Sequence, residues 1–156
     1  MSTRTAPSSI APLFDRLCGV DFTIGNGIHL DAKGFQSSLL LDLFRLLNTR
    51  CDLTIDEFLN CQAHVMNYGL PATNTLSPNS KTDLLKMEQL VQQVIKLFEP
   101  RLKQVRVKAQ ANPFDVKSVM VEIQAAVVFG EQILRFAPSF HLHPGQVELV
   151  VQPEAV

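Results

Sequence analysis

Tryptophan is absent from this 156-residue sequence, tyrosine occurs once, and cysteine occurs three times. The cysteines, Cys18, Cys51 and Cys61, are odd in number and widely spaced, which favours reduced thiols of a cytosolic protein over a disulfide framework. No apolar run approaches the roughly 20 residues of a membrane-spanning helix. The first ten residues lack the apolar segment of a secretory signal. The sequence therefore predicts a soluble intracellular protein.

The sequence also has no marked excess of acidic or of basic residues. The chain has 14 basic and 15 acidic residues and a net charge of −1, so no general attraction to nucleic acid or to an anionic membrane is expected. Hydrophobic residues make up 46% of the sequence, enough for one domain with a real core. Residues 1–12 begin with a Ser, Thr, Pro and Ala-rich stretch and are predicted to form a flexible tail. Residues 13–152 are predicted to form a single domain.

The strongest pattern runs from Asp83 to Ala109. Apolar residues recur every three or four positions as on one helix face, namely Leu84, Met87, Val91, Val94, Ile95 and Phe98. Pro100 ends the helix because it has no N–H and restricts the residue before it. From Val105 the pattern alternates, which predicts a strand with a charged outer row over 101–108. We call residues 99–102, which separate helix from strand, the knuckle.

The knuckle contains an unfavourably placed charge. Glu99 follows the end of the helix, where the negative end of the helix dipole costs an exposed carboxylate about 0.3–1 kcal/mol. Arg101 is the nearest candidate partner, although an exposed ion pair contributes only about 0–1 kcal/mol. A compensating partner for Glu99 is therefore expected.

The segments before residue 83 read mainly as helices. A short amphipathic helix is predicted from about Pro12, with an apolar face of Leu13, Phe14 and Leu17, and Phe14 is expected in the core. Residues 19–36 hold four glycines and predict a long surface loop. A strongly apolar helix is expected to begin at Ser37 and to end around 48–50. Thr54 and Glu57 have the spacing of a capping box, which predicts another short helix.

The segments after residue 109 read as strands. Apolar residues alternate from Val119 to Val127, and Gly130-Glu131 suits the tip of a hairpin. A third strand is predicted over 132–141, with Pro138 marking an edge or a bulge. After a turn at 143–146, a short valine-rich strand follows over 147–151. The predicted fold class is α+β, with N-terminal helices packed on one face of a four-stranded antiparallel meander.

Residues that could carry chemistry form no convincing site. Two carboxylates could hydrolyse a glycosidic bond, but no pair has a recognisable catalytic context. Two spaced pairs could together bind zinc, Cys61 with His64 and His141 with His143, yet neither has a standard finger spacing. The basic residues of 101–108 lack interleaved aromatics, so a solvated face or a docking surface is preferred to a nucleic-acid site. We predict no catalytic residue, no metal and no cofactor.

Three stretches occur together in a distinctive order: DLFRLLNTR at 42–50, VMNYGLP at 65–71 and FEPRLKQVRV at 98–107. They resemble TssE, the baseplate subunit of bacterial type VI secretion systems. LFDRL at 13–17 also fits the N-terminal pattern of that family. TssE is related to the small wedge protein of contractile phage tails, which carries a "lysozyme-like" label. The resemblance covers roughly residues 13–150.

The resemblance implies a non-enzymatic structural protein in the cytoplasm, docked at the inner face of the cell envelope through the baseplate. The implied partners are the baseplate subunits TssF, TssG and TssK and the sheath proteins TssB and TssC, without nucleic acid or membrane insertion. Glu99, Pro100 and Arg101 match the partner-binding Glu-Pro-Arg motif of the family. The positions that match fold-supporting motifs are Asn48, Thr49, Arg50, Tyr68 and Gly69. The resemblance also implies that the protein offers a template to the first sheath ring. The short valine-rich last strand would present an edge of unpaired N–H and C=O groups to which a partner strand could add.

Two other functions remain open at the level of sequence. The family label suggests a peptidoglycan hydrolase. The second alternative is a regulatory binding module of the same fold. It would be similar to the bacterial anti-adaptor that blocks a sigma-factor delivery protein. The intact Glu-Pro-Arg and Asn-Thr-Arg motifs argue against the regulatory module, and the lack of a carboxylate pair in a catalytic context argues against the hydrolase.

Overall fold

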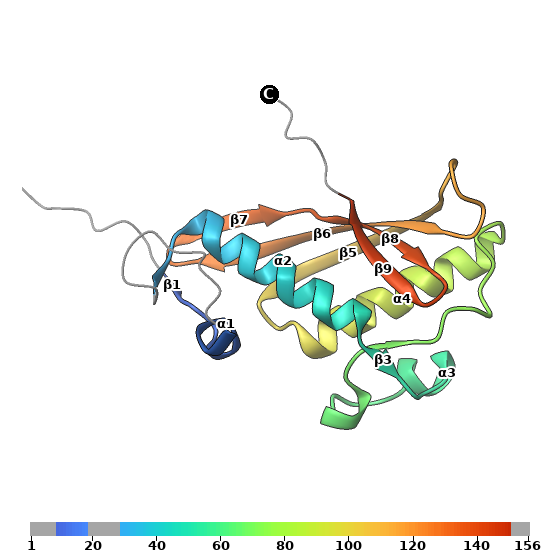
Figure 1. The fold of residues 1–156 in the computed structure, drawn as a ribbon, viewed down its shortest axis with the longest axis horizontal. Helices are drawn as coiled ribbons and strands as arrows, with labels where there is room; N and C mark the ends of the chain where they lie inside the picture. Colours follow the sequence, from blue (N-terminus) through green and yellow to red (C-terminus); the bar gives the residue numbers. More distant parts are fainter. Residues whose placement is uncertain (1–8, 19–28, 151–156) are drawn as a thin grey trace, which may run out of the picture.

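The computed structural model describes residues 9–18 and 29–150 and shows helices packed against an antiparallel sheet (Figure 1). Part of the predicted 1–12 tail and of the predicted 19–36 loop therefore lies outside the described residues. The elements are β1 (Ser9–Ile10), α1 (Leu13–Cys18), β2 (His29–Leu30), α2 (Ala32–Asn48), β3 (Arg50–Cys51), α3 (Ile55–Leu59), the 3₁₀ helix η1 (Val65–Asn67), β4 (Leu70–Pro71), α4 (Lys81–Phe98), β5 (Leu102–Ala111), β6 (Val119–Phe129), β7 (Gln132–Phe136), β8 (Ser139–His143) and β9 (Gln146–Val150).

The main sheet has five strands in the order β5-β6-β8-β9, with β7 also paired to β6. The predicted four-stranded meander is therefore not confirmed, although the α+β class is. The single strand predicted over 132–141 is two strands, which pair antiparallel with successive parts of β6. Pro138 lies between them, where its carbonyl accepts a hydrogen bond from the Ile123 N–H at 2.9 Å. Proline cannot donate to a ladder, so it interrupts the strand without removing it from β6.

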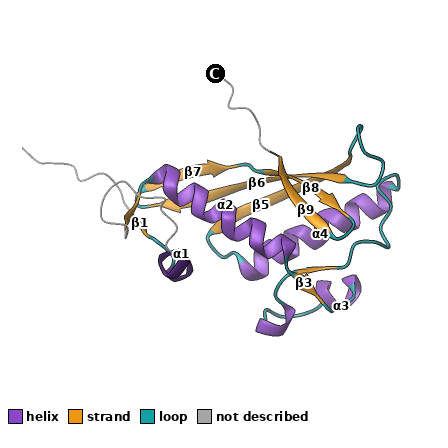
Figure 2. Ribbon diagram, in the orientation of Figure 1, coloured by secondary structure: helices purple, strands orange, loops and turns teal. Residues whose placement is uncertain are grey.

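Among the described residues, helices cover only one face of the sheet. The odd-numbered residues of β6 from Val119 to Phe129 are buried, whereas Gln124 and Val128, on the other face, are exposed. Both long helices, α2 and α4, lie on the covered side (Figure 2). The strand period of two thus places one row of side chains against the helices and the other in solvent. This confirms the predicted alternation.

Helix α2 begins earlier than predicted. We expected Ser37 at its start, but Asp31 is the N-cap and its side chain accepts a 2.7 Å hydrogen bond from the Gly34 N–H. Glycine in the first turn suggested a loop, yet the Asp31 cap supplies the acceptor that the open N–H groups need. Ser37 and Ser38 are therefore interior helix residues, and Ser38 is fully buried.

The predicted change from helix to strand within the knuckle is confirmed. Helix α4 ends at Phe98 and β5 begins at Leu102. The charged outer row predicted over 101–108 is present for Lys103, Arg106 and Lys108, which are exposed and lie opposite outer-face residues of β6, while Arg101 precedes the strand. A bulge that shifts the register between Lys103 and Arg106 places these three side chains on one face. Gln104 in this bulge has a left-handed φ of 52°. The extra residue breaks the alternation at the start of the strand.

Helix α1 forms where it was predicted, but its orientation differs from expectation. Phe14 was expected in the core and is 56% exposed. The buried residue of α1 is Asp15, 1% exposed. None of the helices within the described ranges combines the length and apolar character needed to cross a bilayer.

Candidate functional site

The three sequence motifs meet at one end of α2. Strands β3 and β4 pair in parallel, with Arg50 opposite Leu70. The Leu70 N–H also donates a 2.8 Å hydrogen bond to the carbonyl of Thr49. These bonds join the Asn-Thr-Arg motif at 48–50 to the Tyr-Gly motif at 68–69, although the two are about 20 residues apart in the sequence.

Gly69 makes this junction possible. Its φ is +123°, and a β-carbon at this position would lie 2.4 Å from the Thr49 carbonyl oxygen. Only glycine adopts this backbone conformation readily and leaves room for so close an approach. The prediction that Gly69 supports the fold remains a prediction, and this geometry gives it a physical reason.

Tyr68 connects the junction to the knuckle. Its ring packs edge-on against Phe98, the last residue of α4, with 5.3 Å between ring centroids. Burial raises the pKa of the Tyr68 hydroxyl, and the nearby carboxylates of Asp42 and Glu99 raise it further. All three motifs are thus within one electrostatic environment.

Glu99 obtains its compensating partner from the same motif. The Arg101 guanidinium donates two hydrogen bonds to its carboxylate, from Nε at 2.6 Å and from Nη2 at 2.7 Å. The Glu99 side chain is 6% exposed and Arg101 is 30% exposed, so this is not the exposed pair considered at the sequence level. Such a bidentate pair has fixed geometry as well as charge. The hydrogen bonds that Arg101 donates to Glu99, and then to Asp42, raise the pKa of Arg101 above its ordinary value.

A chain of ion pairs extends from the knuckle along α2 to α1. Arg101 Nη2 donates to Asp42 at 2.8 Å, and Arg45 Nη1 donates both to Asp42 and to Asp15 at 3.2 Å. We call these residues, Glu99, Arg101, Asp42, Arg45 and Asp15, the charged network. The sequence motifs do not mark Asp42, Arg45 or Asp15 as site residues. A signal was present, since Ser38, Asp42 and Arg45 form a polar row on an otherwise apolar helix.

Asn48 connects the site to the last strand of the sheet. Its side-chain amide accepts a 3.0 Å hydrogen bond from the Val147 N–H and donates a 3.1 Å bond to the Val147 carbonyl. The amide therefore takes the place of a neighbouring strand at one position of the β9 edge. Thr49 is the C-cap of α2, and its hydroxyl donates to the Arg45 carbonyl at 2.8 Å.

The structure thus brings most of the predicted site residues together. Glu99 and Arg101 pair directly, Tyr68 packs against Phe98 beside them, and Gly69 lies against the backbone of Thr49. Pro100 is exposed at the tip of the knuckle. Arg50 is also exposed, and it lines a pocket outside the charged network.

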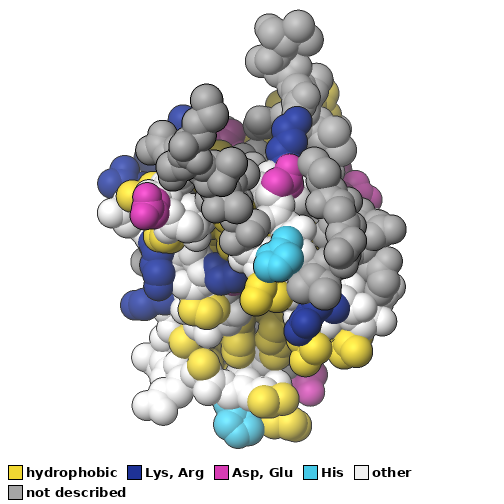
Figure 3. Space-filling view, turned by 90° about the vertical axis from the view of Figure 1, so that its left-hand side faces the viewer, with side chains coloured by type: hydrophobic (Ala, Val, Ile, Leu, Met, Phe, Trp, Pro, Cys, Tyr) yellow, Lys and Arg dark blue, Asp and Glu magenta, His cyan; other side chains and the backbone are white. Residues whose placement is uncertain are grey.

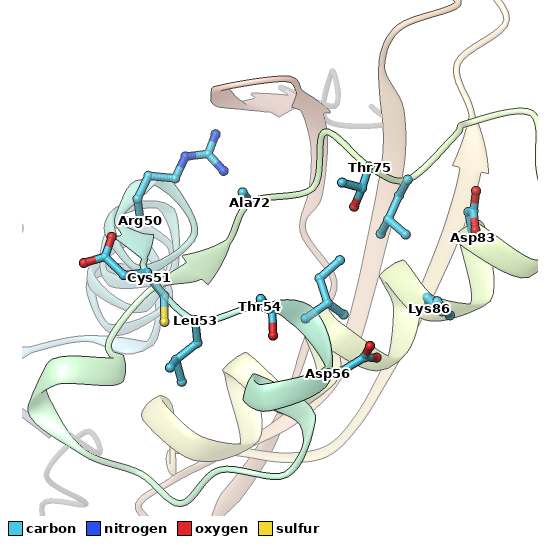
Figure 4. A pocket seen from close by; sticks show the side chains of 12 residues that line it. Arg50, Cys51, Leu53, Thr54, Asp56, Ala72, Thr75, Asp83 and Lys86 are labelled. Atoms are coloured by element: carbon cyan, nitrogen blue, oxygen red, sulfur yellow. The ribbon is translucent and has the colours of Figure 1, made fainter.

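That pocket has a volume of about 690 Å³ and is formed by β3, α3 and the start of α4 (Figure 4). Some of its polar side chains already stabilise helix starts. The Thr54 hydroxyl caps α3, and Asp83 accepts a 3.0 Å hydrogen bond from the Ser77 N–H before α4. Within the described residues, no group of three or more His, Cys, Asp or Glu is arranged to hold a metal ion.

The geometry of the charged network suits recognition. Each of its carboxylates is held by a guanidinium, and both arginines keep about a third of their side-chain surface open to solvent. A preorganised guanidinium of this kind binds a carboxylate or carbonyl oxygen of a partner with little loss of side-chain entropy.

The model of one family, described as "Baseplate wedge protein gp25", matches residues 35–132, which include all three motifs. No curated protein sequence matches the chain. A chain from a solved structure described as "The baseplate complex from the type VI secretion system" is 18% identical, with a TM-score of 0.44, covering 70% of this chain and 98% of its own length. The family match spans more than half of the sequence and confirms the resemblance to the baseplate wedge family. The chain belongs to the gp25 family of baseplate wedge proteins.

Proposed function

We propose that this protein is a non-enzymatic structural subunit of a type VI secretion baseplate. In this role it binds TssF and TssG through the knuckle, with TssK in the same assembly, at the cytoplasmic face of the cell envelope. Membership of the wedge family supports the baseplate role, and the three motifs that resemble TssE support the type VI assignment. The observation that carries the proposal is the Glu99–Arg101 pair, which presents a fixed, partly exposed guanidinium where the three motifs meet.

The first test removes both charges of the knuckle. In the double variant Glu99→Ala with Arg101→Ala, neither member of the pair remains buried without its partner, so the domain should stay folded. We expect its affinity for a purified TssF–TssG complex to fall at least 100-fold, measured by biolayer interferometry. The matched control is Lys103→Ala, which removes an exposed basic residue two positions along β5. Unchanged affinity of the folded double variant would contradict the proposed role of the knuckle.

We further propose that the sheet templates the first ring of the sheath proteins TssB and TssC by strand pairing. The outer edge of β9 is already capped at Val147 by the Asn48 amide. The outer edge of β7 is the other candidate. The Arg135 carbonyl points outward there, because it accepts a 3.2 Å bond from Gln36 of α2. Ile133, two residues earlier and 76% exposed, directs its N–H and carbonyl to the same side.

Ile133→Pro tests this edge. Proline removes an outward N–H that does not pair with β6, so the sheet itself should form. The cyclised residue obstructs an incoming strand. We expect cells carrying Ile133→Pro to form few or no contractile sheaths, counted by fluorescence of a labelled sheath subunit, while TssF–TssG binding is retained. Ile133→Ala keeps the N–H and should form sheaths normally. Normal sheath numbers with Ile133→Pro would exclude pairing at this edge.

A further inference from the structure

Helix α1 has its polar residue inside and its apolar residues outside. Asp15 is 1% exposed, whereas Leu13, Phe14 and Leu17 are 63%, 56% and 75% exposed. A short helix on the surface of a monomer normally has the opposite arrangement. Exposed apolar side chains that lie together mark interaction surfaces more often than solvated ones. We call Leu13, Phe14 and Leu17 the α1 face.

This orientation is fixed by specific contacts. The Ser38 hydroxyl donates to one carboxylate oxygen of Asp15, and Arg45 donates to the other at 3.2 Å. Arg45 also lies over the Phe14 ring, with its guanidinium carbon 4.7 Å from the ring centroid. Rotating α1 to bury its leucines would remove the partners of Asp15. The α1 face is therefore held outward by the fold.

The α1 face is continuous with the knuckle. Arg45, which holds Asp15 and covers Phe14, also pairs with Asp42, and Asp42 pairs with Arg101. The apolar helix and the polar knuckle thus share one set of charged residues. The space-filling view from the end of the molecule where α1 lies shows hydrophobic side chains at the surface beside Lys and Arg side chains (Figure 3).

The charge offered to solvent at this surface is positive. The carboxylates of Asp15, Asp42 and Glu99 are 1%, 24% and 6% exposed. The side chains of Arg45 and Arg101 are 31% and 30% exposed, and Arg16 on α1 is exposed as well. An approaching partner therefore meets guanidinium groups around an apolar centre, which favours an acidic partner surface.

We propose that the α1 face is the apolar half of the partner-binding surface whose polar half is the knuckle. Its occupant is an amphipathic helix of a baseplate subunit. The apolar row of that helix covers Leu13, Phe14 and Leu17, and the flanking carboxylates pair with the arginines of the surface. This inference rests on the proposed function and assigns the chemistry of the partner.

The experiment compares full-length variants for binding to the purified TssF–TssG complex. The double variant Leu13→Glu with Leu17→Glu places two carboxylates on an exposed face and should weaken binding at least tenfold, because the apolar contact is lost and acidic residues repel. Arg16→Glu should weaken binding several-fold, with a larger loss at 50 mM than at 500 mM NaCl. The control Leu85→Glu changes a leucine that is 53% exposed on α4, about 20 Å along the helix from Glu99, and should bind normally.

The knuckle double variant separates this inference from the proposed function. If it loses binding while the α1 variants bind as the unaltered chain does, the inference is wrong and the proposed function stands. If the unaltered chain does not bind TssF–TssG, both are wrong. Concentration-dependent dimerisation that the α1 variants abolish, with TssF–TssG binding unchanged, would assign the face to a second copy and overturn the proposal. Loss of binding in the knuckle variant and in the α1 variants, with each variant still unfolding cooperatively well above the assay temperature, supports it.

Discussion

Replacing Arg101 with alanine is expected to lower the free energy of unfolding by about 2–3 kcal/mol. The Glu99 side chain, 6% exposed, would lose both guanidinium hydrogen bonds and remain as a charge with little access to water. Breaking a fully buried pair in this way costs about 3–5 kcal/mol. Arg101 is itself 30% exposed, so solvent screens part of the interaction and the lower value is expected. Urea unfolding monitored by circular dichroism gives the difference.

Two variants make this measurement specific. Arg106→Ala removes an exposed arginine of β5 and should stay within about 0.5 kcal/mol of the unaltered protein. Glu99→Ala combined with Arg101→Ala leaves neither charge of the pair unpaired, so it should recover more than half of the loss. A loss below about 0.5 kcal/mol in Arg101→Ala, or simple additivity of the two single changes, would show that the pair does not stabilise the knuckle.

Gly69→Ala is expected to lower the free energy of unfolding by about 3 kcal/mol. The new β-carbon would lie 2.4 Å from the Thr49 carbonyl oxygen, so the backbone at the β3–β4 junction must move. Alanine also disfavours a φ of +123°. The same shift should expose the Leu70 N–H, which hydrogen exchange measured by NMR can detect.

Gly145→Ala is the matched control. Gly145 also has a positive φ, +97°, but a β-carbon there would meet nothing within 4 Å. The Gly145→Ala substitution should therefore lower the free energy of unfolding only by the backbone strain, about 1 kcal/mol. Equal losses in the two variants would mean that the close approach to Thr49 contributes nothing, and that the left-handed backbone alone accounts for the glycine.

The structure also shows which parts of the fold were predictable from sequence. Helix α4, the stop at Pro100 and the start of β5 follow from short-range rules, because helix periodicity and proline chemistry act within a few residues. The number of strands could not be predicted from such short-range rules. Pro138 by itself predicts a bulge or an edge, and only the separate pairing of β7 and β8 with β6 shows that one strand becomes two.

The candidate site also has one part that the sequence identifies and another that only the tertiary structure shows. The sequence motifs identified Glu99 and Arg101, which are two residues apart. They did not identify Asp42, which lies 59 positions from Arg101 and completes the guanidinium contacts. The orientation of α1 was also missed, because an amphipathic pattern alone predicts that the apolar side faces inward. The burial of Asp15 depends on Ser38 and Arg45 of another helix.

The sequence by itself determined the α+β class, the position of the knuckle and the need for a partner for Glu99, since each depends on local periodicity, proline or the helix dipole. Its motifs also indicated the wedge family. Tertiary structure alone decided that Arg101 is shared between Glu99 and Asp42, that Gly69 lies against Thr49, and that α1 presents its leucines to solvent. These features depend on contacts between residues far apart in the chain, which are set by packing rather than by local preference.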